Sequence, residues 1–426
     1  MKLLIKNGLV VDPADKIESK IDIAVNNGKI VKKGKALKLS GAKTIDAKGL
    51  VVMPGFVEMH AHFREPGFEY KETIETGSLA AAKGGYTSVC CMPNTNPVID
   101  TQAMVEFIKL KSKQVGIIDV LPIGTITKGG EGKEISAIGE LYKAGAVAIS
   151  DDGACVINSE VLRRALEYSK MFDMPVIEHC EDNDLSADGM MHEGYYSTLL
   201  GLRGIPAAAE ETMIARDIIL ARETGGRIHI AHVSTAGSVE LIKWAKGSGV
   251  KVTAEAAPHH FSLDDSSLQG YDSNFKMKPP LRSAEDVKAV KKALKDGTID
   301  VIATDHAPHA ELDKKVEFMY AAFGIIGLET AFPVIVTNLI NTNVLTLSQA
   351  VAKITINPSS ILKLKAGTLS DGADADITIA DLNAKEKITK EFFASKSINS
   401  PFIGSELSGK IEMTIKKGRV VYRAGM

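Results

Sequence analysis

The chain has 426 residues, of which 45% are hydrophobic and 24% are charged, and its formal net charge is -2. A chain of this length exceeds the size at which one hydrophobic core usually stops growing, so we expect a large domain and a smaller one. The balanced charge gives no indication of nucleic-acid binding. No apolar run approaches the roughly 20 residues that span a bilayer, and no signal-peptide pattern opens the chain, so a cytoplasmic location is the default expectation.

Cysteine usage limits the kinds of metal site that the chain could form. Cys90, Cys91, Cys155 and Cys180 are too few and too irregularly spaced for a disulfide framework or a Cys-rich zinc site. Three of them lie in or near apolar runs, where a reduced cysteine packs as a small hydrophobic residue. Any metal ion must therefore be bound by histidine and carboxylate side chains.

Both ends of the chain contain short runs that are typical of β-strands and tight turns. Apolar and polar residues alternate in these runs, and Asn-Gly pairs at 7–8 and 27–28 mark turns. The runs cover residues 3–12, 22–31, 43–52, 372–382 and 411–425. We predict that the two ends pair into one small, discontinuous β-sandwich domain made of residues 1–52 and 367–426.

The middle of the chain, residues 53–366, alternates apolar strand-like runs with longer segments of helical period, such as 159–173 and 283–297. The apolar runs cover residues 55–63, 87–95, 118–127, 146–153, 175–182, 228–234, 251–260 and 300–309. Such alternation favours an α/β fold with a parallel sheet. Eight units are the number that a closed (β/α)8 TIM barrel requires, so we predict a TIM-barrel catalytic domain.

Polar residues gather at the downstream ends of these runs. They are His60, His62, Asn94, Asp151, Asp152, His179, His232 and Asp305. In a parallel barrel these ends meet on one face, which is where barrel enzymes have their active sites. We therefore expect these residues, far apart in sequence, to converge.

The residue types of this set favour a pair of metal ions. The spacing of two in His60-Ala61-His62 places both imidazoles on one face of a strand, where they can bind one ion together. Since one catalytic zinc ion usually takes three protein ligands, the larger set indicates two ions. We expect His60, His62 and Asp305 at the first ion, His179 and His232 at the second, and one carboxylate of the Asp151-Asp152 pair between them. Two such ions can share a hydroxide that attacks a polarised carbonyl, which suits amide hydrolysis.

Longer segments around these residues identify a family. They read VVMPGFVEMHAHFREPGFEYKETIETG, MPNTNPV, SDDG, EHCED, AHVST, KPPLR, TDHAPH and AFGIIGLET. Together they closely resemble the dihydroorotases of the amidohydrolase superfamily, and the resemblance runs through the whole chain. It implies a hydrolase with two Zn2+ ions per subunit that interconverts (S)-dihydroorotate and N-carbamoyl-L-aspartate in pyrimidine biosynthesis. A homodimer, or an association with other enzymes of that pathway, is compatible with this resemblance.

The resemblance also implies roles at the strand ends. It makes His60, His62, His179, His232 and Asp305 metal ligands, and it makes Asp152 the bridge between both ions. Asp305 is in addition the expected general acid and base, which takes a proton from the hydroxide and delivers it to the leaving ring nitrogen.

Other residues match the substrate contacts of the family. Arg64 resembles the residue that binds the substrate carboxylate, a task that suits the two parallel bonds of a guanidinium. The remaining matches are Asn94, His309, Phe323 and Gly324. Lys278 departs from the pattern, because many bacterial members have Asn before Pro-Pro-Leu-Arg. It either reaches the substrate or turns to solvent.

The remaining histidines have simpler interpretations. His259 and His260 exceed the number of ligands needed, and a structural hydrogen bond is the favoured role. His229 lies three residues before His232, hence on the other face of the strand, and is expected to pack.

Two further polar residues are expected to support the site or the core. His306 follows Asp305 and is expected to orient it. Glu255 is expected to form a buried structural pair, with support of a metal ligand as the alternative.

Two kinds of alternative function stay open. Allantoinase and dihydropyrimidinase share most of the ligands but usually bridge their metals with a carboxylated lysine, whereas the fourth run ends in Asp151-Asp152 and Lys143 lies ahead of it. Arg64 also favours dihydroorotase, because dihydroorotate carries a ring carboxylate. A catalytically silent paralogue would have lost ligands, and all the expected ligands are present.

Overall fold

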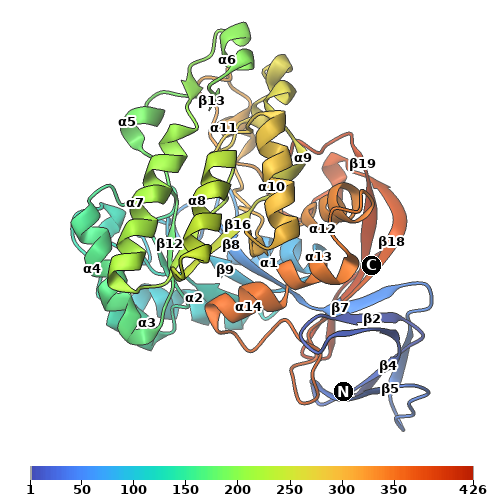
Figure 1. Cartoon of the computed structure of the whole chain (residues 1–426). Helices are drawn as coiled ribbons and strands as arrows, with labels where there is room; N and C mark the ends of the chain where they lie inside the picture. Colours follow the sequence, from blue (N-terminus) through green and yellow to red (C-terminus); the bar gives the residue numbers. More distant parts are fainter. Residues whose placement is uncertain (1, 426) are drawn as a thin grey trace.

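A computed structural model describes residues 2–425 of the chain. The strands near both termini lie together in one lobe, and the strand–helix units of the middle of the chain form the larger lobe (Figure 1). This arrangement follows the division of the sequence into strand-rich ends and an alternating middle.

The strands of the larger lobe run parallel to one another. They are β8 (Phe56–Ala61), β9 (Tyr86–Cys91), β10 (Asp119–Pro122), β11 (Ile149–Ser150), β12 (Val176–Glu178), β15 (Ile228–Ile230), β16 (Val252–Ala256) and β17 (Val301–Ile302). They pair in the orders β10-β9-β8 and β11-β12-β15-β16-β17, and every register in these two sheets is parallel. Each strand falls within one of the apolar runs named above, except that β9 begins one residue earlier, at Tyr86, so the predicted α/β alternation is confirmed.

Helices connect these strands and cover their outer faces. The longer ones are α1 (Ile74–Lys83), α2 (Gln102–Val115), α4 (Ser159–Ser169), α7 (Ala208–Thr224), α8 (Ala236–Gly247) and α10 (Ala284–Asp296). The shorter ones include α3 (Ile138–Ala144), α9 (Pro258–Ser262), α11 (Glu311–Lys314), α12 (Ala331–Ile335), α13 (Leu347–Lys353) and α14 (Ile356–Leu362). An excursion after β12 holds α5 (Asn183–Ser186), β13 (Met191–His192), α6 (Tyr195–Leu200) and β14 (Gly204–Ile205).

Capping residues explain where α4 and α10, the two helices predicted from their helical periodicity, begin. The Asn158 side chain accepts from the backbone of Glu160 and Val161 at the start of α4. At the start of α10, Ser283 and Asp286 form a capping box, which satisfies backbone N–H groups that have no partner within the helix. α10 ends at Gly297, whose φ of 84° is a left-handed conformation that glycine adopts at no steric cost.

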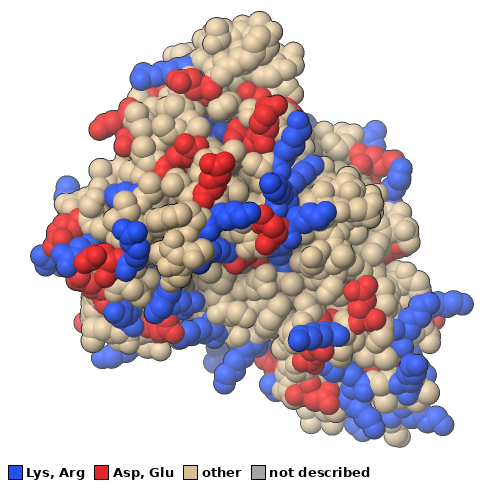
Figure 2. Space-filling model, in the orientation of Figure 1, with Lys and Arg blue, Asp and Glu red and all other residues tan. Residues whose placement is uncertain are grey.

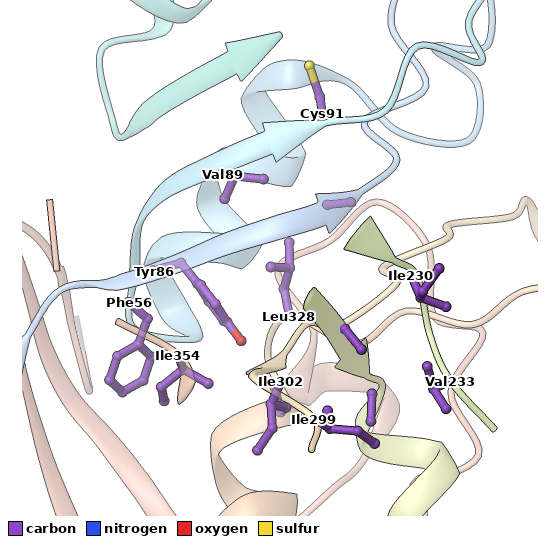
Figure 3. Close-up of a cluster of buried hydrophobic side chains, with 14 of the residues drawn as sticks. Phe56, Tyr86, Val89, Cys91, Ile230, Val233, Ile299, Ile302, Leu328 and Ile354 are labelled. Atoms are coloured by element: carbon purple, nitrogen blue, oxygen red, sulfur yellow. The ribbon is translucent and has the colours of Figure 1, made fainter. Parts of the chain in front are cut away.

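The main core lies between the strands and the helices. Phe56 begins β8 and Tyr86 begins β9, and their rings meet edge to face at 5.6 Å. Figure 3 shows both side chains in a cluster with residues of distant segments, including Ile302 and Leu328. Burying one such side chain stabilises the fold by about 1.5–3 kcal/mol.

The smaller lobe joins the two ends of the chain. Its strands are β1 (Lys2–Lys6), β2 (Leu9–Asp12), β3 (Ile17–Lys20), β4 (Asp22–Asn26), β5 (Lys29–Gly34), β6 (Lys43–Asp46), β7 (Val51–Pro54), β18 (Ile377–Lys387), β19 (Glu406–Lys416) and β20 (Arg419–Arg423). They form sheets ordered β5-β4-β1-β6 and β20-β19-β18-β7-β2-β3. β18 pairs with β7, with Ile377 opposite Pro54, so strands from the two termini share one sheet.

Surface charge and cysteines follow the expectations from composition. On the face drawn in Figure 2, Lys and Arg are interspersed with Asp and Glu. Cys90, Cys91, Cys155 and Cys180 are free and buried. Within residues 2–425, no helix combines the length and the apolar composition needed to cross a membrane.

Candidate active site

The predicted metal ligands converge at the downstream ends of the parallel strands. His60 lies near the end of β8 and His62 just beyond it, while Asp152, His179, His232 and Asp305 follow β11, β12, β15 and β17. All six side chains are buried. Since parallel strands end on the same side of the fold, residues that are up to 245 positions apart meet in one cluster.

Asp152 lies at the centre of this cluster. Its Oδ1 is 3.3 Å from His60 Nε2, 3.7 Å from His232 Nε2 and 3.8 Å from His179 Nδ1. Its Oδ2 is 3.3 Å from His62 Nε2. One carboxylate therefore presents its two oxygens to different histidines, as a ligand between two ions would.

Asp305 completes a second group of ligand atoms. Its Oδ1 is 3.1 Å from His62 Nε2 and 3.6 Å from His60 Nε2. Two sets of side chains could each hold an ion, with ligand atoms within 4.8 Å of one another: His60, Asp152 and His232, and His60, His62 and Asp305. His179 lies outside both sets, although its Nδ1 is 2.8 Å from His232 Nε2.

Unpaired buried atoms show that the cluster fits a cation. Among the described residues, His60 Nε2 and Asp152 Oδ1 have no hydrogen-bond partner. Leaving a buried polar group unsatisfied costs about 1–3 kcal/mol, and coordination would remove that cost. Burial raises the pKa of Asp305, but the hydrogen bond to His62 and the charge of His60 lower it below its usual value overall. The carboxylate is thus ionised at neutral pH, as a metal ligand must be.

Two side chains orient the histidine pair. Glu255 Oε1 is 2.5 Å from His60 Nδ1, and Asn94 Oδ1 is 2.9 Å from His62 Nδ1. These contacts direct both Nε2 atoms into the cluster and fix the tautomer of each ring. Burial opposes ionisation of Glu255, but His60 and His229 lower its pKa to about 2.

Three residues of the site other than glycine have left-handed backbone conformations. The φ angles are 60° at Arg64, 32° at His232 and 47° at Asp305. Such conformations cost on the order of 1–3 kcal/mol in residues other than glycine and persist where the surrounding structure enforces them, commonly at functional sites.

A pocket of about 340 Å³ opens onto the cluster. Its lining residues are His62, Arg64, Asn94, Asp152, Gly153, His179, His232, Lys278, Asp305, Ala307, His309, Phe323 and Gly324. Every residue predicted for the site lies on this surface except His60, which is fully buried behind it. The structure thus brings the predicted ligands and the predicted substrate contacts together.

Comparison with known proteins agrees with this geometry. Residues 49–238 match a family model described as dihydro-orotase-like. The chain is 57% identical to a dihydroorotase of Pelotomaculum thermopropionicum, over 99% of this chain and 98% of that protein. It is 54% identical to a dihydroorotase of Acetivibrio thermocellus, over 99% of both chains.

The chain belongs to the dihydroorotase family.

Solved structures relate this dihydroorotase-family chain to enzymes named for other cyclic amides. It is similar to an L-hydantoinase (dihydropyrimidinase) from Arthrobacter aurescens, with a TM-score of 0.89 and 27% identity over 100% of this chain and 96% of that one. It is also similar to a dihydropyrimidinase from Brevibacillus agri, with a TM-score of 0.88 and 24% identity over 99% and 95% of the two chains. The second likeness shows the shared fold alone.

Arg64 and His309 form one wall of the pocket in this family member. Arg64 Nε donates to the Pro308 carbonyl at 3.1 Å. Burial and the charge of Arg64 lower the pKa of His309 to about 2, so its ring is neutral at pH 7. His309 Nε2 is 2.8 Å from the Phe323 carbonyl and Nδ1 is 3.3 Å from Lys71 Nζ. We therefore assign the proton to Nε2, which donates to Phe323, while Nδ1 accepts from Lys71.

Lys278 lies on the pocket wall rather than pointing freely into solvent. Its Nζ is 2.6 Å from Glu181 Oε1 and 5.5 Å from the centre of the Phe323 ring. Burial opposes ionisation of Glu181, but His179 and Lys278 lower its pKa to about 2. Glu181 is not among the residues predicted from the sequence, although its spacing of two from His179 was the available signal.

One expectation about a supporting residue was wrong. His306 does not orient Asp305, because its Nε2 is 3.5 Å from Glu72 and its Nδ1 accepts from the backbone N–H of Gly327. Asp305 instead lies against His62, so the two adjacent side chains have separate partners.

Glu255 also does more than form a structural pair. Glu255 contacts His60 as well as His229. Its Oε2 is 3.2 Å from His229 Nε2, so His229 is hydrogen-bonded rather than merely packed. His260 Nε2 donates to the Pro279 carbonyl at 3.0 Å, which is the structural contact expected for that histidine.

Proposed function

We propose that this chain is a dihydroorotase that reversibly hydrolyses (S)-dihydroorotate to N-carbamoyl-L-aspartate in pyrimidine biosynthesis. The observation that carries the proposal is the pocket in which Arg64 accompanies a carboxylate–imidazole cluster centred on Asp152. A guanidinium suits the ring carboxylate of dihydroorotate. The full-length identity to proteins named dihydroorotase supports the same substrate.

The metal cofactor proposed is a pair of Zn2+ ions. His60, His62 and Asp305 would hold one ion, His179 and His232 the other, and Asp152 would lie between them. The nitrogen and oxygen donors suit zinc, and the unpaired His60 Nε2 and Asp152 Oδ1 support coordination. Bound zinc would supply Lewis acidity and lower the pKa of water.

The chain's own residues would bind the ring and move the proton. Arg64 would hold the substrate carboxylate, and Asn94, Lys278, His309, Phe323 and Gly324 would line the rest of the ring site. Asp305 would accept the proton of the attacking water and deliver it to the leaving ring nitrogen, since an ionised carboxylate in reach of both can do both. The neutral His309 would keep the Phe323–Gly324 backbone in place through its bond to the Phe323 carbonyl.

For the larger lobe we propose a closed (β/α)8 barrel over residues 53–366. Isolated parallel bridges between Gly124 and Ile149, and between Ala61 and His306, link the edges of the two parallel sheets and support closure. A cluster of buried side chains from β8, β9, β12 and β17 supports a filled interior.

For the smaller lobe we propose a β-sandwich of residues 1–52 and 367–426. One hydrophobic cluster draws residues from both terminal sheets, including Ile5, Ile23 and Ile377, and supports this reading. The cytoplasmic location and the homodimer, or association with other pathway enzymes, stay predictions.

A substrate panel with the zinc-loaded protein tests the function. We expect turnover of dihydroorotate and little turnover of allantoin or dihydrouracil. Ring closure converts a carboxylate into an amide and takes up a proton, so the equilibrium should shift toward dihydroorotate at lower pH whatever the enzyme variant.

Two results would overturn the proposal. A preference for allantoin or dihydrouracil would assign one of the alternative cyclic amidohydrolase functions. A protein that binds zinc stoichiometrically but turns over none of the three would indicate a catalytically silent paralogue.

A further inference from the structure

Asn399 is a buried polar residue that no part of the proposed mechanism uses. It lies between the short helix η6 (Lys390–Phe392) and β19, in the C-terminal stretch assigned from sequence to the smaller domain. Only 4% of its surface is exposed. Its carboxamide nonetheless makes three hydrogen bonds, all to backbone groups of the larger lobe.

These bonds join two segments that both line the substrate pocket. Asn399 Nδ2 donates to the carbonyls of Ala307 and Gly324, each at 3.1 Å, and Oδ1 accepts from the backbone N–H of His309 at 3.2 Å. Ala307, His309 and Gly324 are all pocket residues. The Asn399 carbonyl also accepts from Ile326 N at 3.0 Å, which ties its own backbone to the same region.

The two segments approach too closely for ordinary side chains. Gly324 has a φ of 124°, and a Cβ placed there would lie 2.8 Å from Ala307 Cβ and 3.2 Å from His309 Nε2. The two segments are therefore closely packed at Gly324, and a small shift of either one would change the contacts between them. A backbone hydrogen bond from Ala307 N to the Ile325 carbonyl at 2.8 Å joins the two segments directly, and the Asn399 side chain adds bonds to the backbones of both, with both amide hydrogens and the amide oxygen in use.

We propose that Asn399 is a positioning residue for substrate binding. Its carboxamide sets the spacing between residues 307–309 and 322–326, and so the placement of the His309 ring and the Phe323–Gly324 backbone against the substrate. The inference deepens the proposed function, on which its choice of substrate rests. Within residues 2–425, none of the hydrogen bonds of Asn399 reaches a proposed metal ligand, so its loss should change substrate affinity and leave zinc binding intact.

The test replaces Asn399 with aspartate, which has the same shape but cannot donate. A carboxylate would then face the carbonyl oxygens of Ala307 and Gly324, and the hydrogen bonds from residue 399 to these two carbonyls would be lost. Asn399→Ser removes the contacts without adding charge, and it decides the question if the aspartate variant does not fold. Asn357→Asp is the matched control, because Asn357 Nδ2 donates to one backbone carbonyl, that of Asp300, at the opposite end of β17.

Zinc content, thermal midpoint, KM and kcat would be measured for each variant. We expect KM for dihydroorotate to rise by about ten- to a hundredfold in the Asn399 variants, with wild-type zinc content and a smaller change in kcat, because the displaced groups would lose hydrogen bonds to the substrate, each of which contributes on the order of tenfold to affinity. Asn357→Asp should keep the wild-type KM.

Three outcomes would overturn the inference: an unchanged KM in folded Asn399→Ser, a loss of activity that follows the loss of zinc, or an equal rise in KM in Asn357→Asp. A wild-type protein that prefers another cyclic amide would refute the proposed substrate instead. The KM comparison, repeated with that preferred compound, would still decide the role of Asn399.

Discussion

Replacing Glu255 with glutamine is expected to weaken metal binding without removing a metal ligand. Glu255 is 1% exposed and lies 2.5 Å from His60 Nδ1. Its pKa falls from 4.5 to about 2, despite burial, because of His60 and His229. That change corresponds to about 3 kcal/mol in favour of the ionised carboxylate, which glutamine cannot replace. Changes of such supporting partners typically cost about 10–100-fold in metal affinity, or about 1.4–2.7 kcal/mol, and we expect a loss in this range.

The assay is bound zinc against buffered free zinc, with elemental analysis of the dialysed protein. Glu329→Gln is the matched control, because Glu329 is also a buried glutamate but accepts from the backbone of Ala394 and Ser395, away from the cluster. If Glu255→Gln binds zinc within about twofold of the wild type, or if Glu329→Gln loses affinity equally, Glu255 does not orient a ligand through His60.

Three further predictions concern the pocket and the fold. Arg64→Lys keeps the charge but loses the two parallel bonds, so KM for dihydroorotate should rise by about tenfold or more with little change in bound zinc; an unchanged KM would remove Arg64 from the carboxylate site. Lys278→Ala should raise KM severalfold, and unchanged KM and kcat would show that Lys278 only pairs with Glu181. Burial raises the pKa of Glu329 from 4.5 to about 7, so the stability that its protonated form contributes is present below pH 4.5 and lost as the pH rises to 7. Between these pH values the free energy of unfolding of the wild type should fall by up to about 3 kcal/mol relative to that of Glu329→Gln. The difference between the thermal midpoints of the two proteins at each pH would measure this change.

The strand-end pattern could be read from the sequence because it depends on local regularities. Buried parallel strands appear as short apolar runs, and polar residues at their downstream ends must share one face. The choice within Asp151-Asp152 was beyond such reasoning. Neighbouring residues of a strand alternate between faces, so the pattern says that one of the pair enters the site but not which one. In the structure Asp151 accepts from the backbone of Ile126 and Thr127, whereas Asp152 meets the histidines.

The error at His306 arose because adjacency in sequence does not imply contact. Asp305 and His306 have separate partners in the structure. The left-handed backbone of Asp305, with a φ of 47°, breaks the regular alternation of a strand, so face parity could not predict the two directions. Glu72, the observed partner of His306, lies more than 200 residues away and has no spacing that marks it.

Composition divides the chain near residue 366, but hydrogen bonds to the backbone that lines the pocket cross that boundary. The stretch that contains Asn399 precedes β19, yet Ser395 and Lys396 bond to Glu72, and Ala394 bonds to Glu329, both in the larger lobe. Such bonds between side chains and backbone depend on how distant segments meet, so no periodicity or motif reveals them. A chain that ends at residue 366 would therefore lose the groups that hold His309 and Gly324 in place, together with the smaller lobe. The C-terminal stretch belongs to the active site by its contacts, although it belongs to the β-rich lobe by its composition.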